Sequence, residues 1–401
     1  MKYGFLTMLI PKELEEEVRR NSTNNMQDAA NALQWNLFEG FQKNIAEDVR
    51  LFNTLPIGSF PQYYRLPFIK ASRFDTEFNT GNVNIGFCNV KLLRKFHQSS
   101  RIYKELKKWC EEDDEKTLFV YTETAPLLKA VSRLKRQYSN LKVCVIIADL
   151  PGMSNLSAEK SILRKWIEKY GAAITYKYMS CVDSYVLLTK HMAQRLEIDK
   201  PWVVMEGIAG KSAPCAPAPA EAKTILYTGT LHMRFGVRTL VDAFRLIPNA
   251  DYRLVICGLG DSEDYIKACA QGDKRILFKG QVTRQEALQL QQQATVLVNP
   301  RQNNEEFTKY SFPSKTMEYL ASGVPVVAYK LDGIPDEYDD YINYVEDNSP
   351  ESLAKKLTEI CNMEKEARME MGKRGAEFVL KNKNAEVQTR RILEFIQSLS
   401  K

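Results

Sequence analysis

The sequence predicts an α/β protein built from two doubly wound domains, each a parallel sheet covered by helices. Short apolar runs alternate with amphipathic stretches along the chain, which is typical of repeated strand–helix–strand units. A chain of 401 residues is too long for one ordinary hydrophobic core and suits two domains of similar size. A loop at 209–222, with Pro214, Pro217 and Pro219 among alanines, is the expected joint between them.

The predicted elements follow from the apolar runs and the helical spacing between them. The first half contains predicted strands at Gly4–Ile10, Thr117–Tyr121, Val143–Ala148 and Ser184–Leu188, and helices at Leu127–Gln137 and Ile162–Tyr176. The second half contains predicted strands at Thr224–Thr228, Tyr252–Cys257, Ile276–Lys279, Val296–Asn299 and Val324–Tyr329, and helices at Val237–Leu246, Ser262–Ala270, Arg284–Ala294, Lys315–Ala321 and Asn384–Leu399. Ligands of such sheets gather at the carboxyl ends of the strands.

Composition excludes several classes of protein. Hydrophobic residues make up 44% and charged residues 26%, the profile of a globular protein, and no apolar run reaches the length of a membrane span. The eight cysteines are scattered without a Cys-x-x-Cys pair, which favours a reducing cytoplasm and no structural metal. We expect no nucleic-acid partner.

Basic residues are concentrated in residues 65–142, where 16 Lys and Arg face 9 Asp and Glu. Within this region the segment 91–109 interleaves basic residues with apolar ones such as Leu92, Phe96, Leu106 and Trp109. This pattern suits a helix lying on an anionic membrane surface, and it equally suits a helix packed on the core with one solvated side.

One segment of the second half contains, in order along the chain, the residue types that a nucleotide-binding site requires. Ser311 or Ser314 is expected to cap a helix whose free amides attract an anion. Lys315 adds a positive charge in the first turn, which is unfavourable there unless an anion offsets it. About one turn later, Glu318 is able to accept both hydroxyl protons of a ribose, and Gly323 ends the helix.

Residues 311–327 read Ser-Phe-Pro-Ser-Lys-Thr-Met-Glu-Tyr-Leu-Ala-Ser-Gly-Val-Pro-Val-Val. This segment resembles the donor-binding signature of retaining glycosyltransferase family 4, in its bacterial capsule and exopolysaccharide branch. The segments 225–231, 277–282 and 146–151 resemble the phosphate loop, the base-contacting strand end and the sugar-facing strand end of that family. The resemblance implies a GT-B fold, with a first domain at 1–208 joined by the terminal helix 384–401 and a second domain at 223–383.

The resemblance also implies the roles of individual residues. Glu318 is expected to bind the ribose, and Asp149 to contact the reacting sugars. The residues expected at the diphosphate, the donor sugar or the base are Gly229, Thr230, Arg234, Gln281, Val282, Tyr310, Ser314 and Lys315. The implied reaction transfers a hexose with retention from a nucleoside diphosphate sugar, most simply a UDP-sugar, to a saccharide or lipid-linked acceptor at the cytoplasmic face of the membrane. It needs no metal cofactor.

The sequence departs from the family pattern at two places. Tyr310 stands where the family has a second glutamate, and Thr230 and Phe235 stand where many relatives have an arginine and a lysine. These departures motivate one alternative, a non-catalytic subunit that supports a partner transferase. A nucleotide-sugar epimerase remains a second alternative, because it can share the two-domain fold. Asp149 has an alternative too, as a residue that caps a turn ahead of Pro151.

Overall fold

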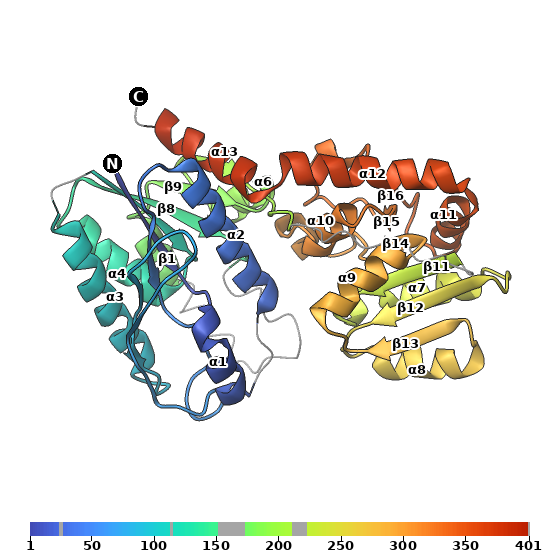
Figure 1. Cartoon of the computed structure of the whole chain (residues 1–401), viewed down its shortest axis with the longest axis horizontal. Helices are drawn as coiled ribbons and strands as arrows, with labels where there is room; N and C mark the ends of the chain where they lie inside the picture. The colour runs from blue at the N-terminus through green and yellow to red at the C-terminus, as the bar shows by residue number, and fades with distance from the viewer. Residues whose placement is uncertain (24–26, 113–114, 151–172, 211–222, 400–401) are drawn as a thin grey trace. The chain divides into compact units, whose positions relative to one another are not determined.

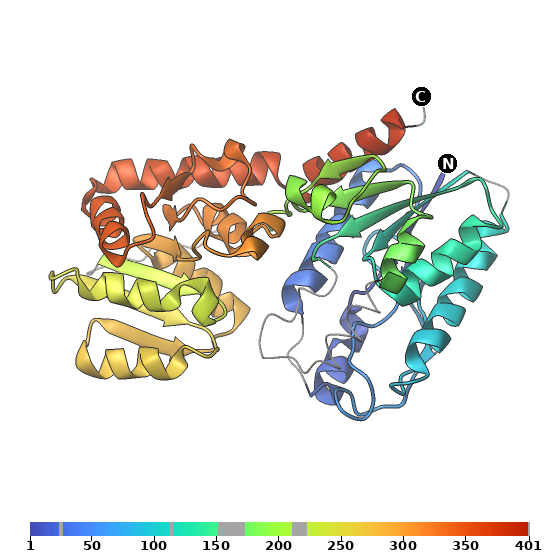
Figure 2. The same cartoon turned by 180° about the vertical axis from the view of Figure 1, so that it is seen from behind.

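The computed structural model describes residues 1–23, 27–112, 115–150, 173–210 and 223–399 (Figure 1). The chain divides into two compact units: the first is Met1–Ile208 with Ala385–Lys401, and the second is Ala209–Asn384. Each unit has its own mostly parallel sheet with helices packed on it, so the predicted α/β class is confirmed (Figures 1 and 2).

The first unit is built on a sheet with the strand order β10-β9-β8-β7-β1-β2-β5-β4, in which every pair except β4 with β5 is parallel. Its strands are β1 (Lys2–Thr7), β2 (Arg50–Asn53), β4 (Ser72–Phe74), β5 (Asn82–Asn84), β7 (Lys116–Tyr121), β8 (Leu141–Ile147), β9 (Ser184–Leu187) and β10 (Trp202–Val204). Two further strands, β3 (Phe68–Ile69) and β6 (Phe87–Cys88), form a small antiparallel sheet.

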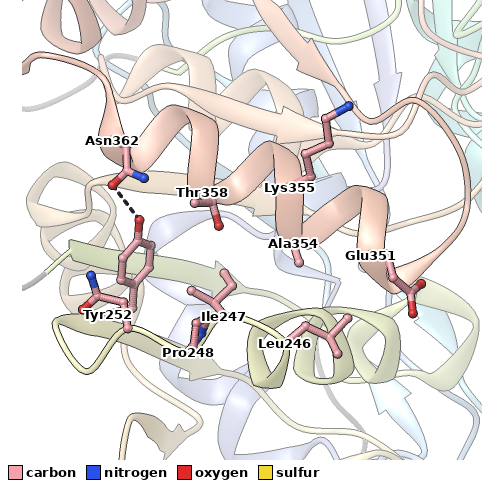
Figure 3. Close-up of a pocket in the computed structure, with 10 residues that line it drawn as sticks. Leu246, Ile247, Pro248, Tyr252, Glu351, Ala354, Lys355, Thr358 and Asn362 are labelled. Carbon is pink, nitrogen blue, oxygen red and sulfur yellow. Dashed lines mark hydrogen bonds between the residues drawn. The ribbon is translucent and has the colours of Figure 1, made fainter.

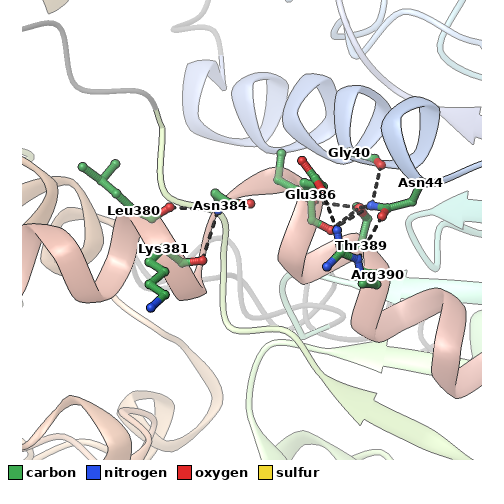
Figure 4. A network of polar contacts seen from close by, with 9 residues as sticks. Gly40, Asn44, Leu380, Lys381, Asn384, Glu386, Thr389 and Arg390 are labelled. Atoms are coloured by element: carbon green, nitrogen blue, oxygen red, sulfur yellow. Dashed lines mark hydrogen bonds and ion pairs between the residues drawn. The ribbon is translucent and has the colours of Figure 1, made fainter.

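The helices of this unit are α1 (Glu15–Asn21), α2 (Asp28–Asn44), α3 (Arg94–Cys110), α4 (Ala125–Lys135), α6 (Lys190–Arg195) and the terminal α13 (Ala385–Ser398). Helix α13 lies directly against α2, where the amide of Asn44 donates to the carbonyl of Glu386 at 2.8 Å and to the Thr389 hydroxyl at 2.9 Å (Figure 4). A Cβ at Gly40 would stand 2.3 Å from the carbonyl oxygen of Ala385, so the close approach needs glycine.

The second unit contains a fully parallel sheet with the order β13-β12-β11-β14-β15-β16. Its strands are β11 (Lys223–Thr228), β12 (Tyr252–Cys257), β13 (Ile276–Gly280), β14 (Val296–Asn299), β15 (Val326–Ala328) and β16 (Ile342–Tyr344). Its helices are α7 (Val237–Arg245), α8 (Glu263–Gly272), α9 (Arg284–Gln293), α10 (Ser314–Ala321), α11 (Pro350–Asn362) and α12 (Lys365–Asn382). Because chain order and spatial order differ in this way, the connections cross over the sheet and leave its carboxyl edge to loops.

Some helices and strands have other bounds in the structure than the sequence predicts. Strand β1 stops at Thr7, because the next backbone amides leave the ladder for side chains: Met8 donates to Gln34 at 2.7 Å and Leu9 to Asn53 at 2.9 Å. Strand β15 is shorter than predicted, since Pro325 has no N–H for a central ladder. Residues 162–172 of the predicted helix, and 211–222 of the predicted joint, lie outside the described residues. No described helix is long and apolar enough to cross a membrane.

Candidate functional site

The predicted donor-binding residues lie at the carboxyl edge of the second unit's sheet, around helix α10. Strands β11, β13 and β14 end there at Thr228, Gly280 and Asn299. Helix α10 begins at Ser314, after the short helix Glu306–Tyr310 that follows β14, and its first turns carry Lys315 and Glu318. Residues from three predicted segments therefore share one edge of one sheet.

Lys315 and Glu318 form an ion pair on this helix, with 2.7 Å between Nζ and Oε1. The same carboxylate oxygen accepts from the Gln291 amide at 2.7 Å, and that amide also donates to the Thr228 hydroxyl at 2.9 Å. Gln291 is fully buried in α9, and its Oε1 is buried without a partner among the described residues. Gln291 thus holds the Glu318 carboxylate in place and keeps its own Oε1 as a hydrogen-bond acceptor. The sequence analysis did not predict Gln291 as a site residue.

The surroundings of Glu318 favour the ionised form of its carboxyl. Burial by itself would raise the pKa of its carboxyl, but the charge and hydrogen bond of Lys315, the Gln291 amide and the charge of Arg284 outweigh it, so the pKa is lowered. A carboxylate that stays charged at neutral pH is the acceptor that a pair of ribose hydroxyls requires.

The phosphate-loop segment is held closely against the neighbouring strand end. The backbone N–H of Gly229 donates to the carbonyl of Cys257 at 3.0 Å, and the Tyr227 hydroxyl donates to the carbonyl of Thr230 at 2.8 Å. Gly258, at a φ of 141°, permits this approach, because a Cβ there would stand 1.8 Å from the Gly229 oxygen. The Gly229 amide is therefore engaged in the fold, and a contact of Gly229 with a diphosphate stays a prediction.

Arg234 follows in the short helix Met233–Phe235, where its Nε donates to Glu305 at 2.8 Å and its Nη2 completes a bidentate ion pair. Glu305 therefore contacts the arginine assigned to the diphosphate. Tyr310, at the position of the family's second glutamate, donates its hydroxyl to Glu306 at 2.8 Å.

The capping expectation is wrong. Helix α10 is preceded by Pro313 at its N-cap without a side-chain cap, and Ser314 is its exposed first residue. Its first amides are therefore not satisfied by Ser311 or Ser314. Gln281 is exposed directly after β13, while Val282 is half-buried against the core beneath α10.

In the first unit, Asp149 follows the carboxyl end of β8, as predicted, and is exposed to solvent. Its neighbour across the sheet is Glu123, which follows β7 and is buried. The pKa of Glu123 is raised to about 7, because burial and the charge of Asp149 outweigh the Thr122 hydroxyl and a backbone amide, which lower it. The pKa of Asp149 is raised too, because protein atoms surround its carboxyl although the residue as a whole is exposed. Two carboxyls thus stand together at this edge, and sequence reasoning found only one.

Other features of the described residues do not contribute to this site. A pocket of about 540 Å³ lies between α7 and α11, where Tyr252 at the start of β12 donates to Asn362 at 2.9 Å (Figure 3). It is at the amino end of the strand and contains none of the predicted residues. No group of three His, Cys, Asp or Glu side chains that would hold a metal occurs in the described part of the chain.

Residues 215–378 match the family model described as glycosyl transferases group 1. No significant match was found among curated protein sequences.

Three solved structures extend the likeness to the whole chain. A sucrose-phosphate synthase from Thermosynechococcus elongatus superposes with a TM-score of 0.66 at 14% identity, over 100% of this chain and 99% of its own. A trehalose 6-phosphate synthase from Burkholderia multivorans gives 0.63 at 10% identity, over 100% and 97%. HepE from Anabaena, solved in complex with UDP, gives 0.61 at 13% identity, over 99% and 100%. The chain therefore has the GT-B fold of two Rossmann-like domains, and its second unit carries the sequence pattern of the group 1 glycosyl transferases.

Proposed function

We propose that this protein is a retaining glycosyltransferase that moves a hexose from a nucleoside diphosphate sugar to a saccharide or lipid-linked acceptor. The observation that carries the proposal is the ion pair of Glu318 and Lys315 at the carboxyl edge of the second unit's sheet. It provides an acceptor for ribose hydroxyls and a cation for phosphate about one helical turn apart, in a segment that matches group 1 glycosyl transferases.

The chemistry needs charge stabilisation at the leaving group. The acceptor hydroxyl attacks the sugar on the face from which the nucleoside diphosphate departs, so the anomeric configuration is retained. Lys315 and Arg234 stabilise the growing charge of the diphosphate, and the uncapped first turn of α10 adds its amides. In this proposal Asp149 contacts the reacting sugars. UDP is the favoured nucleotide, and the structurally similar HepE was solved with UDP bound.

The isolated protein tests this proposal directly. It is incubated with a panel of nucleotide sugars, and thermal stabilisation and donor hydrolysis are followed. Stabilisation by one UDP-sugar together with slow release of its sugar supports a transferase. Conversion of the donor to its epimer would identify an epimerase instead, and binding without any turnover would favour a non-catalytic subunit.

We further expect transfer to be independent of divalent cations, because side-chain cations and helix amides carry the leaving-group charge in this proposal. Transfer rates measured with excess EDTA and with added manganese should agree within error. Complete loss of transfer in EDTA that manganese restores would contradict the expectation.

We propose that the acceptor is presented at the cytoplasmic face of the membrane, in capsule or exopolysaccharide synthesis, and that the first unit contacts that surface. The apolar surface available to a membrane is smaller than residues 91–109 predict, because Leu106 and Trp109 of α3 are buried in the core. Phe68, Leu92, Leu93 and Phe96 remain exposed, and β6, which pairs with the strand of Phe68, contacts α3. We call these four residues the apolar patch.

The apolar patch is accompanied by the exposed Lys91 and Lys95, and each basic residue near an anionic surface contributes about 1 kcal/mol. Sedimentation should therefore show binding to vesicles with phosphatidylglycerol that is weak on phosphatidylcholine and lost at high salt. Phe96→Asp should abolish it, while Met369→Asp, at an exposed methionine of the second unit, should not. Binding that ignores lipid charge, or no binding, would leave a soluble acceptor.

A further inference from the structure

We infer that Arg301, rather than Arg234 or Lys315 alone, is the principal cation that holds the diphosphate of the donor. This inference rests on the proposed function, because it assigns a residue to the same nucleotide site. Arg301 lies two residues beyond the end of β14, at the carboxyl edge that carries Glu318.

The two cations assigned from sequence already have carboxylate partners. Arg234 is held by Glu305 in a bidentate ion pair, and Lys315 is 2.7 Å from Glu318. Each cation therefore either divides its positive charge between the carboxylate and a phosphate, or breaks the ion pair before it binds a phosphate. A bidentate arginine–carboxylate pair is among the stronger polar contacts in proteins, so Arg234 is poorly available.

Arg301 differs from both of them. Its guanidinium stacks on the ring of Phe235 at 4.2 Å and lies 5.5 Å from the ring of Phe307, and its only hydrogen bond with a described residue is a long one of 3.4 Å to the Ser311 hydroxyl. It forms no ion pair with any residue that the structure describes. The guanidinium is held against these two rings, and its burial lowers the pKa of Arg301. A desolvated cation without a counter-ion is costly, and an anion would remove that cost.

The position of Arg301 also fits a diphosphate. Phe235 ends the short helix of the phosphate-loop segment, and Ser311 lies in the loop that leads into α10. The Arg234 guanidinium stands 5.1 Å from the same Phe307 ring. Two guanidinium groups therefore lie around this ring: that of Arg234 is paired with Glu305, and that of Arg301 has no carboxylate partner among the described residues. The planar fork of an arginine matches phosphate oxygens, and stacking on Phe235 fixes its orientation.

The test separates charge contact with phosphate from support of the fold. Calorimetry measures the affinities for UDP and for uridine in the full chain and in Arg301→Met and Arg301→Lys. In Arg301→Met we expect UDP affinity to fall about 10–100-fold with uridine affinity nearly unchanged, and the loss in Arg301→Lys to be smaller. Arg275→Met is the matched control, because Arg275 also stacks on a phenylalanine, Phe244 at 4.9 Å, but is paired with Asp273.

The outcomes are distinguishable. If the unmodified protein binds neither UDP nor another nucleoside diphosphate, the proposed function itself fails, and if it binds another one, the same ratio is measured with that nucleotide and its nucleoside. If it binds UDP and the ratio of UDP to uridine affinity is the same in Arg301→Met, only the role of Arg301 is overturned. An equal fall in both affinities assigns Arg301 to the fold and also overturns the inference. Should Arg301→Met not fold, the same ratio in Arg301→Lys decides, with a lowered ratio supporting the role and an unchanged ratio refuting it.

Discussion

UDP binding is expected to weaken by about 1.5–3 kcal/mol, roughly 10–150-fold, when Glu318 is replaced by alanine. The variant loses a charged acceptor for two ribose hydroxyls, and the side chain is only 25% exposed, so water replaces the contact poorly. The change also releases Lys315 and the Gln291 amide from their shared partner oxygen. A freed Lys315 is able to approach the diphosphate, so the measured loss is a net value.

The ribose contact is isolated by a second ligand. 2′,3′-Dideoxy-UDP lacks both hydroxyls, so the unmodified protein should bind it less tightly than UDP, while Glu318→Ala should bind the two nucleotides equally. Glu359→Ala is the matched control, since Glu359 also pairs with a lysine three residues away on a helix, Lys356 at 2.8 Å. Calorimetry that finds the same UDP affinity with and without the Glu318 carboxylate would remove the ribose assignment.

The sequence was sufficient for the fold class because the strands are buried on both faces and read as short apolar runs. The bounds of β12 and β14 agree with the prediction at both ends, since Gly258 and Pro300 interrupt the apolar runs just beyond them. Periodicity alone did not decide what covers an amphipathic helix. The apolar residues of α3 had two possible partners, membrane or core, and the structure assigns most of them to the core.

The composition of the candidate site was only partly predictable. Glu318 and Lys315 are three residues apart on one helix, so local spacing was enough to bring them together. Gln291 lies 27 residues from Glu318 and 63 from Thr228, and only the packing of α9 against the end of β11 unites them. Arg301 did carry a signal, because it follows a correctly predicted strand at its carboxyl end. The sequence did not predict the pairing of Arg234 with Glu305, nor that Arg301 has no carboxylate partner among the described residues.

Turnover, more than donor binding, is expected to fall when Lys315 is replaced by methionine. In the ground state the lysine shares its charge with Glu318, and negative charge grows on the diphosphate only as the glycosidic bond breaks. Loss of one such donor typically lowers kcat by about 100–1000-fold. Methionine retains the length and the apolar stem of lysine, so packing around the first turn of α10 changes little.

Steady-state kinetics with the preferred donor check this expectation, with kcat reduced and the KM for the donor changed by less than about threefold. Lys356→Met is the matched control, because Lys356 pairs with Glu359 in the same i,i+3 arrangement on α11, and its kcat should equal that of the unmodified protein. A raised KM with normal kcat in Lys315→Met would mean that the lysine binds donor and transition state equally. The leaving-group charge would then be stabilised by other groups of the same edge, Arg301 first among them, without Lys315.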